Sequence, residues 1–112
     1  MNTSIVRAAL ALSLALSSLS VYAGQDVTQK VIRIEVSYMP EKVMIMLETG
    51  NPATCPVGEW IHYTGTTYGS SEPKKAVQAA YATALAAMHT GKKVLVHTES
   101  GCIATNIHAT LQ

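Results

Sequence analysis

The first 23 residues constrain the folded part of this chain more than any other feature. Arg7 is their only charged side chain, and an unbroken apolar run follows it until serines interrupt the pattern before Val21-Tyr22-Ala23. A membrane-spanning helix needs roughly 20 apolar residues, and this run is much shorter. The order of charge, apolar run and small residues is typical of a cleavable secretory signal, with an uncleaved tether as the alternative. We expect cleavage after Ala23 and no stable membrane anchor afterwards.

Cleavage there would leave residues 24–112, which is 112 minus 23, or 89 residues, and room for one small domain. Without Arg7, the eight Lys and Arg residues become seven and balance the seven Asp and Glu residues. Nucleic acids and anionic membranes are bound by clustered Lys and Arg, so a neutral chain argues against both as partners. We therefore expect a single exported domain, periplasmic or secreted.

The chain has two cysteines, Cys55 and Cys102, both in the part that would be exported. Oxidising compartments favour pairing, so we predict one internal disulfide, with two free thiols or an intermolecular link as alternatives. The bridge would close a loop of 102 minus 55, or 47, residues. In the loop-entropy account, this closure stabilises the fold by about 4 kcal/mol.

Alternating and helical patterns divide the exported part into five strands and one helix. Over residues 30–38 the apolar residues Ile32, Ile34 and Val36 alternate with polar ones, and Tyr38 continues that face. Strands are expected at residues 30–38, 42–48, 59–64, 92–97 and 103–111. The order β-β-β-α-β-β predicts an α+β domain that is mainly β.

The second predicted strand is apolar on both sides, because Met44 and Met46 occupy the positions where polar residues usually stand. Such a strand is either covered on both sides or presents one side to a partner. Met44 and Met46 are therefore candidates for an oligomer interface.

The helix has clear start and stop signals, with Ser71 as the predicted N-cap, Pro73 in the first turn and Gly91 after the last. One stripe at helical spacing is expected to face the sheet. Its members are Val77, Ala80, Tyr81, Ala84, Leu85 and Met88.

The opposite side of the helix carries only small neutral residues. No charged side chain occurs between Lys75 and His89, which suits close packing on a second surface, although alanine is also simply the best helix former. The candidate interface residues on this side are Ala79, Ala82, Thr83 and Ala86.

No catalytic or metal motif emerges. Asp26 is the only aspartate and lies near the expected new N-terminus, where chains are often loose, which argues against a Ser-His-Asp triad. Glu48, Glu59 and Glu99 stand at predicted strand ends, where solvated carboxylates are expected. The histidines are spread over different elements, and only His97 and His108 could face each other across two strands. We expect no enzyme activity, no metal and no cofactor.

Aromatic and hydroxyl side chains gather near the loop that precedes the helix. Rings stack on sugars and hydroxyls bond to them, but both are also ordinary in cores and loops, and Trp60 fits either role. The candidate ligand contacts are Trp60, Tyr63, Thr66, Thr67 and Tyr68.

The region from Lys74 to Leu111 resembles the B subunits of AB5-type bacterial toxins. The similarity lies in the opening Lys74-Lys75-Ala76-Val77, the exit Thr90-Gly91-Lys92-Lys93-Val94 and the final strand around Ile107-His108-Ala109. The element order is also similar to that family's oligonucleotide/oligosaccharide-binding (OB) barrel. The resemblance implies a ring, usually of five subunits, with helices lining the centre and glycans bound outside.

These observations predict an exported binding protein that recognises a glycan as a ring-forming subunit. A homo-oligomer and a glycan or protein ligand are the expected partners. A monomeric periplasmic domain that binds or inhibits another protein is the alternative, and a small hydrolase is the third hypothesis.

Overall fold

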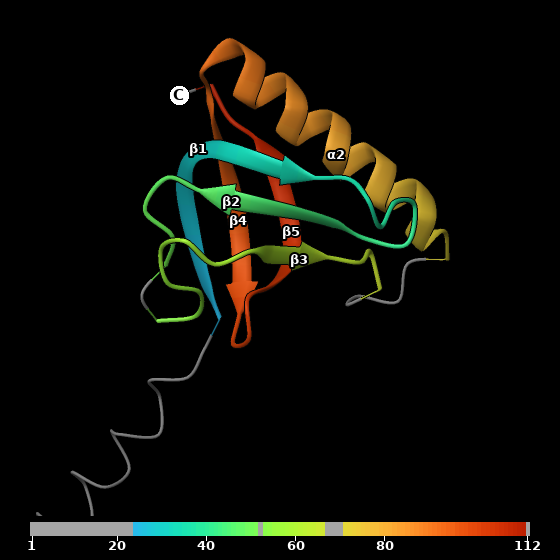
Figure 1. The fold of residues 1–112 in the computed structure, drawn as a ribbon, viewed down its shortest axis with the longest axis horizontal. Coiled ribbons are helices and arrows are strands. Elements are labelled where there is room, and N and C mark those ends of the chain that lie inside the picture. The colour runs from blue at the N-terminus through green and yellow to red at the C-terminus, as the bar shows by residue number, and fades with distance from the viewer. Residues whose placement is uncertain (1–23, 52, 67–70, 112) are drawn as a thin grey trace, which may run out of the picture.

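A computed structural model describes residues 24–51, 53–66 and 71–111, and the order of elements predicted from the sequence is confirmed (Figure 1). The predicted signal and the candidate contacts Thr67 and Tyr68 lie outside the described residues. The elements are β1 (Gln25–Glu35), β2 (Val43–Leu47), β3 (Ile61–Tyr63), α2 (Pro73–Thr90), β4 (Lys93–Glu99) and β5 (Ile103–Ala109). No helix within the described ranges is long and apolar enough to cross a membrane.

The five strands form one closed barrel in the order β1-β2-β3-β5-β4. The long strand β1 pairs antiparallel with β2 through its second half and with β4 through its first half. The barrel closes where β3 and β5 run parallel, at the register pair His62 and Ile103. The domain is therefore a mainly β barrel of the OB-fold type, with one helix between β3 and β4, as predicted.

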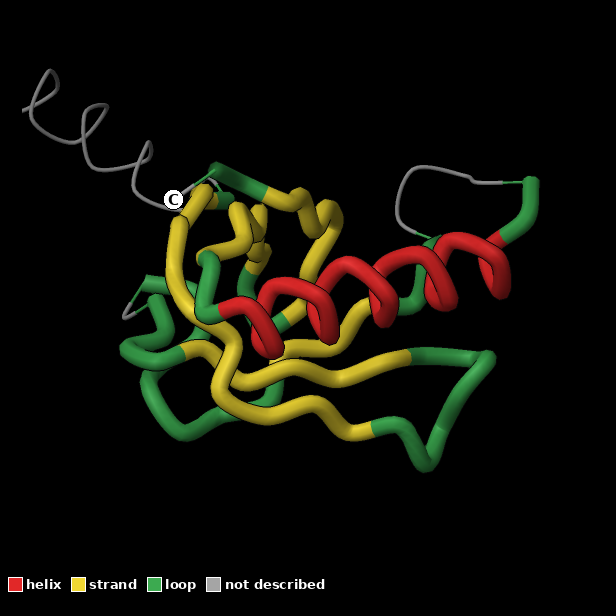
Figure 2. Tube along the Cα trace, turned by 90° about the horizontal axis from the view of Figure 1, so that it is seen from above, coloured by secondary structure: helices red, strands yellow, loops and turns green. Residues whose placement is uncertain are grey.

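The core fills the barrel and extends to the helix that lies across it (Figure 2). From β2, the side chains of Val43, Ile45 and Leu47 point inward and are almost fully buried. The helix contributes small residues, Ala84 and Ala87 among them, which let its backbone approach the strands closely.

The predicted faces of the first strand are wrong in part. The strand begins at Gln25, and a bulge between Val31 and Arg33 shifts its register, so that Val31 is 4% exposed while Ile32 is 48% exposed. A bulge adds one residue to one strand and so reverses the alternation beyond it. Val36 and Tyr38 follow the end of β1 and are exposed in the loop to β2.

The helix ends where predicted but begins and packs differently. Glu72, not Ser71, is the N-cap residue, and it makes no side-chain capping bond. The buried stripe is Val77, Ala80, Ala84 and Ala87. Leu85 and Met88 are partly exposed, because alanines at these spacings bring the helix axis close to the barrel and turn the larger residues outward. At the other end, Gly91 takes the left-handed conformation that favours glycine.

The predicted disulfide between Cys55 and Cys102 is present. It ties the loop between β2 and β3 to the residue just before β5. Around it, Asn51 and Cys55 exchange two backbone hydrogen bonds, at 2.6 and 2.7 Å, and the hydroxyls of Thr54 and Thr98 lie 2.6 Å apart. Cys55 is fully buried, so the disulfide is part of the hydrophobic core at this end.

Replacing both cysteines by alanine should lower the free energy of unfolding by about 4 kcal/mol, because the 47-residue loop then contributes its full entropy to the unfolded chain. Urea unfolding at neutral pH, followed by tryptophan fluorescence, measures this loss. A double variant as stable as the unreduced wild-type protein would contradict the assignment.

Candidate functional site

The outer side of β2 is covered within a single chain. Met44 and Met46 alternate with the core residues and so face outward, yet each is only 8% exposed. The strand register places Glu35 on one side of Met44 and His62 on the other. Neighbouring side chains on the same face therefore shield the methionines. In one chain, Met44 and Met46 offer little surface for an oligomer interface.

A small polar cluster with an aromatic ring lies at the edge of this face. The loop from β1 to β2 brings the Lys42 ammonium to 4.7 Å from the centre of the Tyr38 ring and 3.4 Å from Nδ1 of His62. The Tyr38 side chain is more than half exposed, at 53%. Burial, and then the charge of Lys42, lower the pKa of His62. The neutral imidazole therefore accepts a hydrogen bond from Lys42.

Trp60 adds a second aromatic ring to the same side of the barrel. It directly precedes Ile61, the first residue of β3, whose side chain is buried in the core; if the alternation of β3 is extended back by one residue, Trp60 falls on the same side as His62. We call Tyr38, Lys42, Met44, Trp60 and His62 the β2–β3 face. It combines rings that can stack on an apolar sugar surface with an ammonium and an imidazole that bond to hydroxyls.

The other predicted ligand contacts lie elsewhere. Tyr63 is half-buried and packs against the core on the inner side of β3. Thr66 is exposed, and its hydroxyl bonds to that of Thr64 at 2.7 Å. The structure thus separates Tyr63 from Trp60 and adds Tyr38, Lys42 and His62. Two sequence features could have pointed to these three residues. The turn after β1 brings Tyr38 and Lys42 back towards β2, and the alternation of β3 puts the His62 side chain on the outer side of the barrel.

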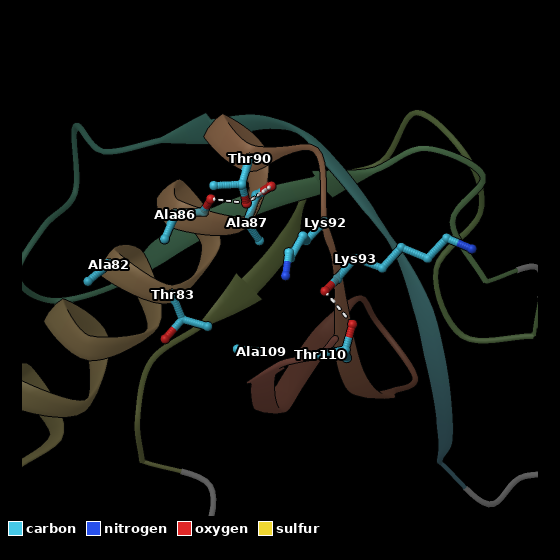
Figure 3. Close-up of a pocket in the computed structure, with 9 residues that line it drawn as sticks. All are labelled: Ala82, Thr83, Ala86, Ala87, Thr90, Lys92, Lys93, Ala109 and Thr110. Carbon is cyan, nitrogen blue, oxygen red and sulfur yellow. Dashed lines mark hydrogen bonds between the residues drawn. The ribbon is translucent and has the colours of Figure 1, made fainter. Parts of the chain in front are cut away.

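A groove runs between the second half of α2 and the end of β5 (Figure 3). Its volume is about 520 Å³. The lining residues are Ala82, Thr83, Ala86, Ala87, Thr90, Lys92, Lys93, Ala109 and Thr110. Three of the helix positions predicted as an interface, Ala82, Thr83 and Ala86, therefore line a concave surface. The fourth, Ala79, is exposed on the same side of the helix.

The polar groups of the groove are mostly turned to the backbone. The hydroxyls of Thr83 and Thr90 donate to helix carbonyls at 3.0 and 2.8 Å, and that of Thr110 donates to the Lys93 carbonyl at 2.8 Å. Their methyl groups join those of the alanines. In Figure 3 the Lys92 amine points into the groove, whereas that of Lys93 points away. The groove is thus lined by methyl groups with one ammonium at its edge.

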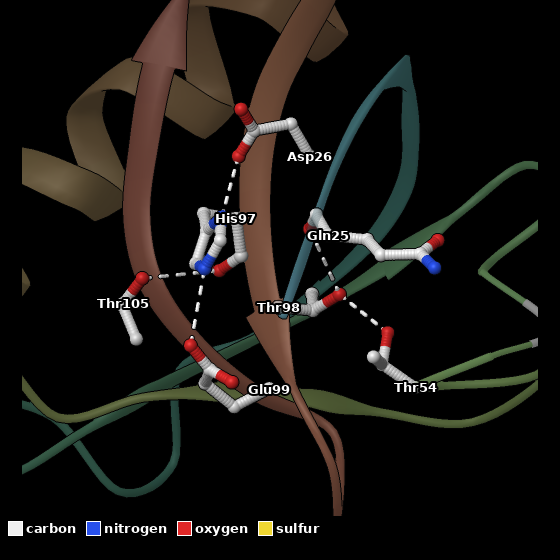
Figure 4. A network of polar contacts seen from close by, with 7 residues as sticks. All are labelled: Gln25, Asp26, Thr54, His97, Thr98, Glu99 and Thr105. Atoms are coloured by element: carbon white, nitrogen blue, oxygen red, sulfur yellow. Dashed lines mark hydrogen bonds and ion pairs between the residues drawn. The ribbon is translucent and has the colours of Figure 1, made fainter. Parts of the chain in front are cut away.

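A second polar cluster, outside the β2–β3 face and the groove, joins β1 to β4. His97 lies between two carboxylates, with Nδ1 at 2.6 Å from Asp26 Oδ1 and Nε2 at 3.0 Å from Glu99 Oε1 (Figure 4). Asp26 stands directly opposite His97 in the strand register. The hydrogen bond to Asp26, followed by that to Glu99, raises the pKa of His97. The prediction that Asp26 is loose and Glu99 merely solvated is therefore wrong, because strand pairing brings both to one imidazole.

The two carboxylates of this cluster favour the protonated form of His97. Both ring nitrogens donate to carboxylates in the protonated form, so neither has a lone pair with which to accept a proton. His108 lies opposite Leu95, and His97 opposite Asn106, so the two histidines do not face each other directly. Among the residues that the structure describes, no three His, Cys, Asp or Glu side chains are arranged to hold a metal ion.

Comparisons with protein-family models, with curated proteins and with solved structures found no match for this chain.

His97 and His62, whose pKa values are shifted in opposite directions, should change the free energy of unfolding in opposite pH ranges. The raised pKa of His97 gives stability that is complete below its usual pKa of 6.5 and is lost as the pH rises through the folded value. The lowered pKa of His62 gives stability that is complete above 6.5 and is lost as the pH falls through the folded value.

Unfolding measurements from pH 5 to 9 on the wild-type, His97→Gln and His62→Gln proteins test this. His97→Gln should cost most at low pH, by at most about 1 kcal/mol for a pair near the surface. A cost that grows with pH would contradict the ion pairs. NMR titration of the two imidazoles should give one pKa above and one below 6.5.

Proposed function

We propose that this chain is an exported binding subunit that recognises a saccharide through the β2–β3 face and associates with further copies of itself. The observation that carries the proposal is the exposed Tyr38 ring beside Lys42 and His62, on the outer side of strands 2 and 3 of an OB-type barrel. This side of the OB fold is a general site for oligosaccharides and oligonucleotides.

Charge favours a saccharide over a nucleic acid. Nucleic acids are bound by several basic groups that neutralise phosphates, whereas the exported part balances seven basic with seven acidic residues. On the β2–β3 face, Lys42 is the only lysine or arginine. Its ammonium lies 4.7 Å from the centre of the Tyr38 ring and makes a cation–π contact with it. One ammonium, one neutral imidazole and two rings suit hydroxyl-rich rings better than a phosphate chain.

The helix supports self-association. Its outer side is uncharged from Ala76 to Met88, and a soluble helix usually shows charges to water. The methyl-lined groove beside Ala82 and Ala86 is a concave surface of the kind that a second copy could fill. The resemblance to toxin B subunits, with helices toward the centre of a ring, supports the same arrangement.

The Asp26–His97–Glu99 cluster argues against the hydrolase hypothesis, although it is the best candidate for a catalytic group. A general base must accept a proton, but both nitrogens of His97 are engaged by carboxylates. Binding without self-association remains the alternative, and the oligomeric state decides between the two.

Saccharide binding should depend on the ring and the ammonium of the β2–β3 face. On a glycan array followed by calorimetry with the best glycan, Tyr38→Ala and Lys42→Met should each weaken binding at least about tenfold, since each removes roughly 1.4 kcal/mol or more. Lys30→Met, on exposed β1, is the matched control and should bind like the wild type. An array without hits, or full binding by Tyr38→Ala, would overturn this assignment.

Self-association should depend on the uncharged side of the helix. Native mass spectrometry at micromolar concentration should show an oligomer for the wild type and a folded monomer for Ala86→Glu, because a charge buried at an interface without a partner is costly. Val57→Glu places the same charge at an exposed position in the loop between β2 and β3, away from the helix, and should keep the oligomer. A stable wild-type monomer would exclude the ring and leave the monomeric binding domain.

A further inference from the structure

The Asp26–His97–Glu99 cluster lies next to the expected cleavage point. Asp26 is two residues from Gly24, and the β1–β4 register pairs Gln25 with Thr98, so its continuation places Gly24 opposite Glu99. A side-chain carbon built on Gly24 would lie 2.5 Å from both carboxylate oxygens of Glu99. Gly24 therefore lies beside this carboxylate, and its nitrogen is two bonds from the position of that built carbon.

The cluster is one positive charge short of balance. With His97 in its protonated form, its imidazolium and the carboxylates of Asp26 and Glu99 sum to −1. In a chain that continues upstream, the nitrogen of Gly24 is a neutral amide and adds no charge. A free amino terminus at Gly24 would add one, because an α-amine is mostly protonated at neutral pH.

We propose that cleavage after Ala23 creates an α-ammonium at Gly24 that pairs with the Glu99 carboxylate and completes a network of four alternating charges. In this step a signal peptidase hydrolyses the bond between the Ala23 carbonyl carbon and the Gly24 nitrogen. Water supplies a hydroxyl group to the carbonyl and a proton to the nitrogen, and a second proton from solvent forms the ammonium. The order is then ammonium, Glu99, His97 and Asp26.

The network links processing to the stability of the barrel. Glu99 ends β4 three residues before Cys102, so an ion pair there fixes the first residue of the exported chain at the end of β4. Glycine suits this place because any larger residue would push the carboxylate away. The processed chain thus gains a contact that the precursor cannot make.

The test uses the full precursor, exported from a bacterial host, with the first residue of the purified protein identified by mass spectrometry. NMR titration of the ¹⁵N-labelled α-amine should give a pKa about 0.5 to 1 unit higher in the wild type than in Glu99→Gln, since a nearby carboxylate favours the charged amine. Glu59→Gln removes an exposed carboxylate elsewhere in the chain and should leave that pKa unchanged.

A second measurement separates the ion pair from a general effect on folding. A form that keeps Tyr22-Ala23 ahead of Gly24 is compared with the processed form, each with and without Glu99→Gln. The substitution should lower the unfolding midpoint of the processed form more than that of the extended form. An α-amine pKa that Glu99→Gln does not change, equal losses in both forms, or a first residue other than Gly24 would overturn the proposal.

Discussion

The closure of the barrel between β3 and β5 is the constraint on which the rest of the structure depends. β3 has three residues, and the backbone N–H of His62 donates to the carbonyl of Cys102 at 2.8 Å, next to the single register pair with Ile103. So short a contact is weak by itself. The disulfide joins Cys102 to Cys55 in the loop just before β3, and this bond holds the two edges together. Without it, the sheet would have two open edges instead of a closed ring.

The same closure positions the surface that we propose as the binding site. The backbone of His62 belongs to the closing contact, while its imidazole bonds to Lys42 on the outside. β2 stands between this contact and β1, with its core residues fully buried and its methionines shielded. The β2–β3 face is thus held rigid from behind by the core and from one side by the disulfide. A preformed face of this kind loses little entropy when it binds a ligand.

Local patterns predicted the element order and the disulfide, because strand alternation, helix ends and cysteine pairing depend on nearby residues or on compartment, whereas the barrel type was implied by the resemblance to toxin B subunits. The bulge at Val31–Arg33 could not be predicted, since it exists only relative to the partner strand. The choice of Ala87 over Met88 for the core depends on how closely the helix approaches the barrel. The contact between Asp26 and His97 spans 71 positions in the sequence, and only the paired register of β1 and β4 brings them together. The β2–β3 face was predicted in part, through Trp60, because its other members come from the β1–β2 loop, from β2 and from β3, which only the folded sheet brings together.

Amide hydrogen exchange of His62 tests the central claim most directly, since this one N–H closes the barrel and stands behind the proposed site. We predict that it is protected in the disulfide-bonded protein to nearly the extent of the core amides of β2. In the variant with both cysteines replaced by alanine, under conditions where β2 stays protected, the His62 amide should exchange at least about tenfold faster, which corresponds to roughly 1.4 kcal/mol of local opening. Equal protection in the two proteins would show that the barrel closes without the disulfide and would contradict this account.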